Sequence, residues 1–358
     1  MRLDWTAEID KTLTGKQTLQ SCARFQHYQM YNNATPEQYP YNTQTCYHGL
    51  MTDNRQKMPA LATEPSDSLD SPHPPFNGDL TDLGTLKRLL ARHGIALNKG
   101  LGQHLLISRK ALNAVVGAAD LVPDDSVLEV GAGPGVLTRE LAQQVRRVVA
   151  VELDRAVLPV LRETTADLPN VEIIPRNLLE VRPEDVFGAE PYKLVANLPY
   201  YITSLILRHL LESANPPRVL VVMVQREVAE RLVAGPGDLS LLALSVQLYG
   251  APRIVAYVPA TAFFPPPKVD SAVVRVDLHP APLLDEATTE QFFALIHAGF
   301  AEKRKQIHNS LARHLEASRE TIGRWLAQGE IDPMRRAQTL SLEEWLRLAR
   351  IAEAERSA

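Results

Sequence analysis

The sequence has few cysteines, no long apolar run and no excess of positive charge. Its 358 residues include two cysteines, Cys22 and Cys46. Two cysteines cannot build a disulfide framework or a cysteine metal site, so a reducing compartment is expected. No apolar stretch is long enough to cross a bilayer, and the first residues lack the apolar core of a signal peptide. We therefore expect a cytoplasmic protein, monomeric, without a metal and without a membrane partner.

The charge balance limits the class of partner. The formal net charge is −4, which argues against a wholly basic nucleic-acid binder but leaves room for a local basic face. A hydrophobic share of 45% and a charged share of 22% are ordinary for a globular chain with a sizeable core. The length allows more than one domain.

The first 78 residues differ in composition from the rest. A stretch rich in Gln, Asn, Thr and Tyr is followed by the Pro/Ser/Asp run "TEPSDSLDSPHPPFNGD". Neither buries enough apolar surface to fold, so residues 1–78 are predicted to be a disordered extension. Met51 or Met58 is an alternative start.

Strand and helix patterns alternate from residue 79 to about residue 280. This order predicts an α/β domain with a mostly parallel, Rossmann-like sheet and helices on both faces. From 281 to 358 the pattern is helical only, which predicts a small C-terminal helical domain. A first helix carries Leu80, Leu83, Leu86 and Leu89 and ends near Gly94. The other predicted helices before residue 280 are 109–119, 136–144, 155–165, 205–213, 226–233 and 240–248, and the predicted strands are 126–130, 147–151, 171–174, 193–196, 218–224, 253–258 and 271–278.

A glycine-rich turn follows the first of these strands in "VLEVGAGPGVLTREL". Gly131, Gly133 and Gly135 let the backbone turn tightly before a helix whose N-terminus offers free N–H groups. The Gly-x-Gly-x-Gly order, with Glu129 before it, fits a nucleoside better than a dinucleotide, although a dinucleotide is the competing interpretation.

The next strand ends at Glu152 in "VVAVELD". A carboxylate about 20 residues after the glycines can accept both hydroxyls of a ribose. Together the two motifs predict a nucleoside site, and nicotinamide and S-adenosylmethionine cofactors both remain open at this point.

The stretch "LVANLPYYITS" places polar and aromatic groups where a further strand ends. The Asn197 side-chain oxygen and the carbonyl of Leu198 are two acceptors for an exocyclic amine of adenine. Pro199 shapes the turn, and Tyr200 offers a face on which the base can stack. The alternative is a plain turn that precedes a helix.

Together these motifs resemble those of the ribosomal RNA small-subunit adenine dimethyltransferases, over about residues 81–350. The resemblance rests on "KGLGQHLLIS", "VLEVGAGPGVLT", "VELD", "NLPYYITS", "VPATAFFPPPKVDSAVVR" and "FAEKRKQIHNSL". It implies a class I methyltransferase domain that uses S-adenosylmethionine to dimethylate N6 of two adjacent adenines near the 3′ end of 16S rRNA, in the small ribosomal subunit or its precursor.

The resemblance also assigns roles to individual residues. Asn197, Leu198, Pro199 and Tyr200 form the catalytic motif, and Phe263 is expected on the other face of the target base. His104 and Asn177 stand where the family usually has asparagine and aspartate, and we expect neither to abolish activity. The implied cofactor contacts are His104, Leu106, Gly131, Gly133, Glu152, Asn177 and Asn197.

A basic segment, Lys303, Arg304 and Lys305, predicts phosphate contacts by the helical domain, with Arg313 and Arg324 further along. The alternative is a solvated charged helix. Two other functions stay open: a 23S rRNA adenine methyltransferase of the macrolide-resistance type, and a non-catalytic nucleic-acid-binding assembly factor on the same fold.

Overall fold

The computed structural model describes residues 76–95, 104–200 and 202–357. The predicted disordered extension, apart from its last three residues, lies outside the described residues. So do Lys99 to Gln103 of the first family motif.

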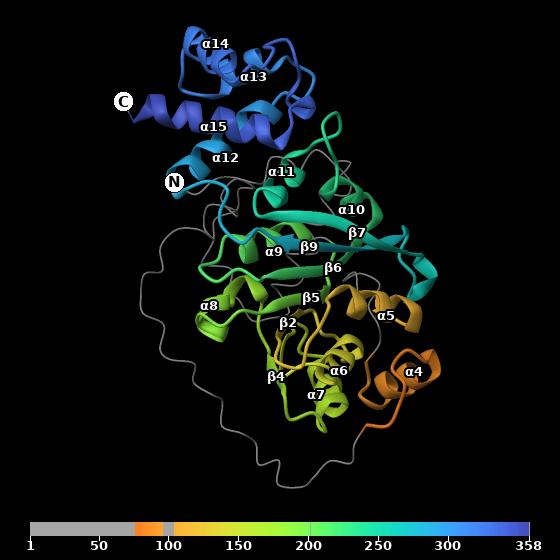
Figure 1. Cartoon of the computed structure of the whole chain (residues 1–358). Coiled ribbons are helices and arrows are strands. Elements are labelled where there is room, and N and C mark those ends of the chain that lie inside the picture. The colour runs from red at the N-terminus through yellow and green to blue at the C-terminus, as the bar shows by residue number, and fades with distance from the viewer. Residues whose placement is uncertain (1–75, 96–103, 201, 358) are drawn as a thin grey trace, which may run out of the picture. The chain divides into compact units, whose positions relative to one another are not determined.

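A seven-stranded sheet with the order β4-β3-β2-β5-β6-β9-β7 forms the centre of residues 126–278 (Figure 1). The strands from β4 to β6 are parallel, while β9 runs antiparallel to β6 and β7 runs antiparallel to β9. The predicted mostly parallel sheet is therefore confirmed, with two antiparallel strands at one side. The strands are β2 (Ser126–Val130), β3 (Arg147–Val151), β4 (Val171–Ile174), β5 (Lys193–Asn197), β6 (Val219–Gln225), β7 (Gly250–Val258) and β9 (Ser271–Leu278).

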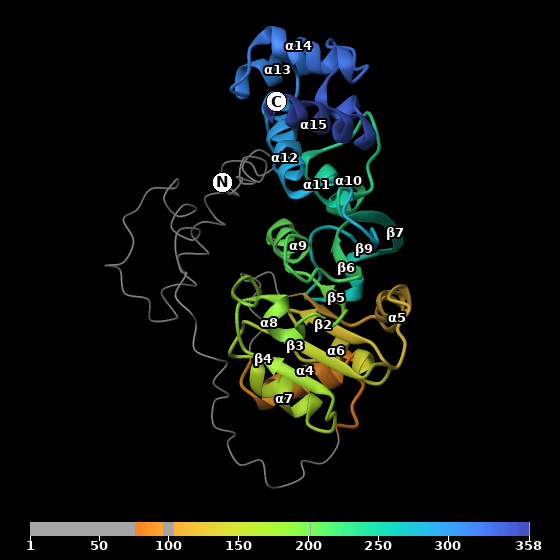
Figure 2. The same ribbon diagram turned by 60° about the vertical axis from the view of Figure 1, so that its left-hand side comes forward.

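Helices cover both faces of this sheet, as Figures 1 and 2 show. Successive strand residues point to opposite faces, so both faces need apolar cover in a parallel sheet. Val127 of β2 packs in the cluster formed with α4 to α7, and its neighbour Leu128 packs in the cluster formed with α8 to α11. The helices are α4 (Leu83–Arg92), α5 (Arg109–Ala118), α6 (Val136–Ala142), α7 (Leu158–Thr165), α8 (Pro183–Phe187), α9 (Thr203–Leu211), α10 (Arg226–Leu232) and α11 (Leu241–Gln247).

Two prolines explain two of the predicted boundaries that were wrong. The helix predicted from residue 155 begins at Leu158, because Pro159 is tolerated only in the first turn of a helix. The strand predicted from residue 253 begins at Gly250 and includes Pro252. β7 is an edge strand, where a missing N–H on the outer side leaves no broken bond.

Short elements around the site were not predicted. A two-residue strand, β1 (Leu105–Leu106), pairs antiparallel with β8 (Phe263–Phe264), which follows the one-turn helix η4 (Ala260–Ala262). The helix α8 and the turn η3 (Leu178–Glu180) were also missed.

The C-terminal residues form helices only, as predicted. Trp345 is fully buried among them, and Gly299 allows its ring to come close, because a Cβ at this glycine would lie 2.6 Å from the Trp345 Cη2 atom. The Gly237 N–H donates to the Gln338 carbonyl at 2.8 Å, and the Gln338 Nε2 donates to the Gly237 carbonyl at 2.9 Å. This pair joins the loop after α10 to the C-terminal helices. These helices are α12 (Glu286–Phe300), α13 (Ile307–His314), α14 (Arg319–Gln328), η5 (Ala337–Thr339) and α15 (Leu342–Arg356).

Candidate active site at the carboxyl edge of the sheet

The predicted cofactor and catalytic residues meet at one edge of the sheet. β2, β3 and β5 are parallel, and they end directly before Gly131, before Glu152 and at Asn197. The strand order reverses between β2 and β5, which makes this the point where ligands bind in open α/β sheets. A Cβ at Gly131 would lie 3.8 Å from the Asn197 carbonyl oxygen. The glycine turn and the catalytic motif are therefore neighbours.

The glycine turn has backbone angles that other residues rarely adopt. Gly131, Gly133 and Gly135 have φ of 72°, 55° and 87°. At Gly135 space is also limiting, since a Cβ there would lie 2.7 Å from the Thr164 Oγ1 atom. The turn thus requires glycine both for φ and for close packing of α6 on α7.

Glu152 stabilises the glycine turn and still has acceptor positions available for a ligand. Its side chain is 8% exposed, and its two oxygens accept hydrogen bonds from the Gly133 N–H at 2.8 Å and the Asp154 N–H at 2.7 Å. Burial raises the pKa of the Glu152 carboxyl, and these backbone donors oppose that shift. A carboxylate has about four acceptor positions, so two remain for the hydroxyls of a ribose. The geometry fits the cofactor expected here.

Glu129 is a second carboxyl in the same region. It lies in β2, is 2% exposed, and burial raises its pKa to about 8. Its Oε2 atom accepts no hydrogen bond of ordinary geometry among the described residues, and the nearby Thr138 hydroxyl only partly opposes the effect of burial on the pKa. The sequence signal was a glutamate within an apolar strand. Its burial was not predicted.

Asn197 is oriented by the residue that precedes β1. Its Nδ2 atom donates to the His104 carbonyl at 3.4 Å, a long and weak bond. Because a carbonyl only accepts, the Asn197 Oδ1 atom is left as an acceptor. The adjoining Leu198 is buried and its N–H donates to the Met223 carbonyl at 3.2 Å, which fixes the start of the motif against β6.

Tyr200 is held by groups that sequence reasoning did not identify. Its hydroxyl shares a hydrogen bond of 2.7 Å with the Ser271 Oγ atom, and burial raises the pKa of this phenol. The His104 ring stacks on the Tyr200 ring at 5.9 Å between centroids and 24° between planes. The Nδ1 atom of His104 lies 2.7 Å from the Pro265 carbonyl. That nitrogen must therefore carry the proton, which leaves Nε2 as the ring nitrogen that can accept a hydrogen bond from a ligand.

Phe263 lies next to this group but is enclosed. It is 2% exposed, belongs to the main apolar core and pairs with Leu106, which is also buried. The adjacent Phe264 is half-buried, with the Lys87 Nζ atom 4.5 Å from its ring centroid. Contact between Phe263 and a target base remains a prediction, and it requires neighbouring side chains to move.

Asn177 stands three residues after β4, near the same edge. Its side-chain oxygen accepts the Leu179 N–H at 3.1 Å and caps η3. The side-chain oxygen has a second lone pair and the amide has two N–H groups. Asn177 can therefore face the adenine of a cofactor without the charge of an aspartate.

Three of the predicted phosphate-binding residues lie before α13, and the other two lie in α13 and α14. Lys303, Arg304 and Lys305 are exposed. Arg313 pairs with Glu302 at 3.0 Å, and Arg324 forms an ion pair with Glu355. The three-residue basic segment is thus exposed, and Arg313 and Arg324 contact carboxylates.

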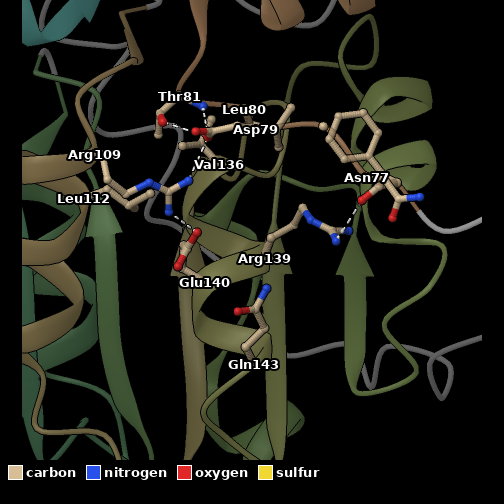
Figure 3. Close-up of a pocket in the computed structure, with 12 residues that line it drawn as sticks. Asn77, Asp79, Leu80, Thr81, Arg109, Leu112, Val136, Arg139, Glu140 and Gln143 are labelled. Carbon is tan, nitrogen blue, oxygen red and sulfur yellow. Dashed lines mark hydrogen bonds and ion pairs between the residues drawn. The ribbon is translucent and has the colours of Figure 1, made fainter.

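A separate pocket of about 350 Å³ lies between residues 76–81 and the helices α5 and α6. Figure 3 shows Arg109 between Asp79 and Glu140 at one side of it. Arg139 donates to the Phe76 carbonyl at 3.1 Å and pairs with Asp167. Carboxylates neutralise both arginines. Arg109 and Arg139 also contact Asp79 and the Phe76 carbonyl, so they attach the first described residues to α5 and α6. The pocket is distinct from the carboxyl edge.

The described residues contain no group of three or more His, Cys, Asp or Glu side chains arranged to hold a metal ion. None of the described helices combines the length and the apolarity needed to span a membrane.

The profile of the "Ribosomal RNA adenine dimethylase" family matches residues 94–353. A "Ribosomal RNA small subunit methyltransferase A" of Dehalococcoides mccartyi is 47% identical over 260 residues, covering 72% of this chain and 89% of that protein. The protein of the same name from Alkaliphilus metalliredigens is 39% identical, covering 74% and 94%.

Solved structures show the same fold. The 23S rRNA methyltransferase ErmE is 31% identical with a TM-score of 0.58, covering 69% of this chain and 98% of that structure. A dimethyladenosine transferase from Plasmodium falciparum has a TM-score of 0.58 at 24% identity, covering 68% and 96%.

The fold and the carboxyl-edge site define a Rossmann-like class I methyltransferase. The chain belongs to the ribosomal RNA adenine dimethylase family. The predicted family, fold, enzyme class and S-adenosylmethionine cofactor are thereby confirmed, with rRNA as the class of substrate.

Proposed function

We propose that this enzyme dimethylates N6 of two adjacent adenines near the 3′ end of 16S rRNA, in the small ribosomal subunit or its precursor. The observation that carries the proposal is the position of Asn197 to Tyr200 beside the glycine turn and Glu152. The relatives named small subunit methyltransferase A support the choice of subunit. We further propose a monomer that acts in the cytoplasm, where its substrate is assembled, and that needs no metal.

The residues of the motif have separate tasks. An adenine amine is a poor nucleophile, because its lone pair is delocalised into the ring. The Asn197 Oδ1 atom and the Leu198 carbonyl accept its two hydrogens and favour a more tetrahedral nitrogen. Tyr200 supports the unstacked base, as chemistry on a base requires. Bound S-adenosylmethionine supplies an electrophilic methyl group, and the protein contributes mainly orientation.

The cofactor contacts are proposed at the same edge. Glu152 accepts the ribose hydroxyls, Gly131 and Gly133 leave room for the backbone to approach, and Asn177 faces the adenine. His104 offers its Nε2 atom, and Leu106 contributes an apolar wall. Lys303, Arg304 and Lys305 contact phosphates and position the RNA.

Asn197→Ala tests the catalytic assignment. We expect loss of methyl transfer to unmethylated 30S particles by at least about 100-fold, with S-adenosylhomocysteine affinity within about fivefold of the wild type. Near-normal dimethylation by this variant would refute the assignment. Circular dichroism and thermal melting check that the variant is folded.

The 31% identity to ErmE favours one second candidate, a 23S rRNA adenine methyltransferase. Primer extension on both rRNAs, from cells with and without the protein, separates the two. A stop at paired adenines of 16S rRNA that disappears on deletion supports our proposal, while a deletion-dependent stop in 23S rRNA supports the alternative.

A further inference from the structure

Tyr257 is an exposed aromatic residue. It lies on an edge strand of the sheet in which β5 leads into the catalytic motif. It is 57% exposed and lies near the end of the edge strand β7. Its backbone pairs with Ala272, and the next residue, Val258, pairs with Ser271. Ser271 in turn shares the hydrogen bond of 2.7 Å with the Tyr200 hydroxyl. Tyr257 is therefore one residue along β7 from the position that holds the catalytic tyrosine.

An arginine lies against the ring of Tyr257. The Arg226 Cζ atom is 5.1 Å from the ring centroid. The Nε atom of Arg226 donates to Glu230 at 2.8 Å, which holds the guanidinium in place, and its side chain is still 56% exposed. Arginine over a tyrosine face is a cation–π contact. Since the guanidinium faces one side of the ring, the exposure of Tyr257 leaves ring surface for a second flat group.

The positions of Arg226 and Tyr257 limit the path of an RNA strand that also reaches Tyr200. Neighbouring residues of a strand point to opposite faces, so Tyr257 lies on the face of α10 and Ser271 on the face of α5. A single strand of RNA with one base at Tyr200 can contact Tyr257 by passing over the carboxyl end of β6 and the amino end of β9. Exposed Lys268 lies in the segment that leads into β9, where positive charge favours a phosphate backbone.

We propose that Arg226 and Tyr257 form a stacking platform for an unpaired nucleotide of the rRNA that flanks the target adenine. The platform rests on the proposed function only in its choice of substrate. RNA is recognised mainly through unstacked bases on aromatic and guanidinium planes, and such stacking tolerates any base. A flipped target leaves its neighbours unstacked, and the platform takes up one of them.

The first test uses the full-length chain, saturating S-adenosylmethionine and unmethylated 30S particles. We expect Tyr257→Ala to raise KM for the particles by about 5-fold to 20-fold with kcat within about twofold, and Tyr257→Phe to remain within about twofold. Val255→Ala is the matched control, since Val255 is 38% exposed on the same strand, and it should behave like the wild type. S-adenosylhomocysteine affinity should be unchanged in all three.

A second measurement separates stacking from charge and does not depend on methyl transfer. In fluorescence anisotropy with a labelled, A-rich single-stranded RNA, Tyr257→Ala should weaken binding at every salt concentration without changing the salt slope. Arg226→Ala should lower the slope of log K against log[salt] by about 1. If the 30S assay fails for the wild type but these binding effects persist, the choice of substrate is wrong and the platform stands.

Three outcomes would overturn the platform. The first is wild-type KM and RNA affinity in Tyr257→Ala. The second is equal loss in the Phe and Ala variants, which would assign the effect to the hydroxyl. The third is weaker binding to 30S particles with unchanged binding to naked 16S rRNA, which would assign the surface to a ribosomal protein.

Discussion

The buried carboxyl of Glu129 predicts that stability falls between mildly acidic and mildly basic pH. Its pKa rises from an ordinary value of 4.5 to about 8 because burial disfavours the charged form. In the unfolded chain the same group ionises near its ordinary pKa. Between these two pH values the folded state retains a proton that the unfolded state has lost, so stability decreases as pH rises.

The magnitude follows from the width of that window. Each pH unit costs about 1.4 kcal/mol, and the whole interval from 4.5 to about 8 corresponds to roughly 5 kcal/mol of unfolding free energy. Above about pH 8 Glu129 is ionised in both the folded and the unfolded state, so its contribution to the unfolding free energy no longer changes with pH. Roughly 5 kcal/mol is a large part of the stability of an ordinary domain.

Glu129→Gln removes the titration and keeps the shape of the side chain. We expect the unfolding free energy of the variant, relative to the wild type, to rise by about 1.4 kcal/mol per pH unit from pH 5 to 8 and then to stay constant. Urea unfolding at half-unit pH steps from 4.5 to 9.5, without cofactor, measures this difference. All other titrating groups are shared by the two proteins and cancel.

Parallel profiles for the two proteins would refute the reasoning, because they would mean that Glu129 ionises alike in both states. A rising difference that continues beyond pH 9 would mean that the folded pKa is higher than stated. Thr138→Val is a second variant: it keeps the Glu129 carboxyl but removes the hydroxyl that lowers its pKa, so stability should still fall as pH rises.

Three other perturbations test the site. Glu152→Gln should weaken S-adenosylhomocysteine binding about tenfold, because hydrogen bonds to a charged group are worth roughly 1.5–3 kcal/mol, and isothermal titration measures it; unchanged affinity would remove Glu152 from the cofactor site. His104→Asn should lower KM for 30S particles by up to about tenfold at saturating cofactor, because the ring on Tyr200 no longer competes with the target base; an unchanged or higher KM would contradict this. Gly135→Ala should cost about 2 kcal/mol or more of stability, since φ is positive and the new Cβ would meet Thr164, and a thermal shift below about 2 °C would be inconsistent with that clash.

The residues that could be predicted from sequence are those whose role depends on local backbone shape. Gly131 and Glu152 follow apolar strands, so their place at the carboxyl edge follows from strand order alone. The same holds for Asn197 at the end of β5. The position of a polar residue just after a strand can be predicted correctly even when the predicted ends of the strand are slightly wrong.

Contacts between distant segments could not be predicted from spacing. Ser271 meets the Tyr200 hydroxyl because β9 runs antiparallel beside β6, and the Pro265 carbonyl reaches His104 because β1 pairs with β8. These pairings join residues far apart in the chain, and two-residue strands have no periodic signal. Pro252 in β7 was misread for a similar reason, since only the sheet order reveals an edge strand.

The two buried carboxyls of the site, Glu129 and Glu152, differ in their tendency to ionise because their surroundings differ. Burial raises the pKa of both, but Glu152 accepts two backbone N–H groups that oppose this shift, whereas the Oε2 atom of Glu129 accepts no hydrogen bond among the described residues. The charge of Glu152 further disfavours ionisation of Glu129. At neutral pH the protonated Glu129 therefore adds no second negative charge beside Glu152, the carboxyl that we propose for ribose binding. It follows that Glu129→Gln should leave cofactor affinity at pH 7 nearly unchanged, although it changes stability at pH 9.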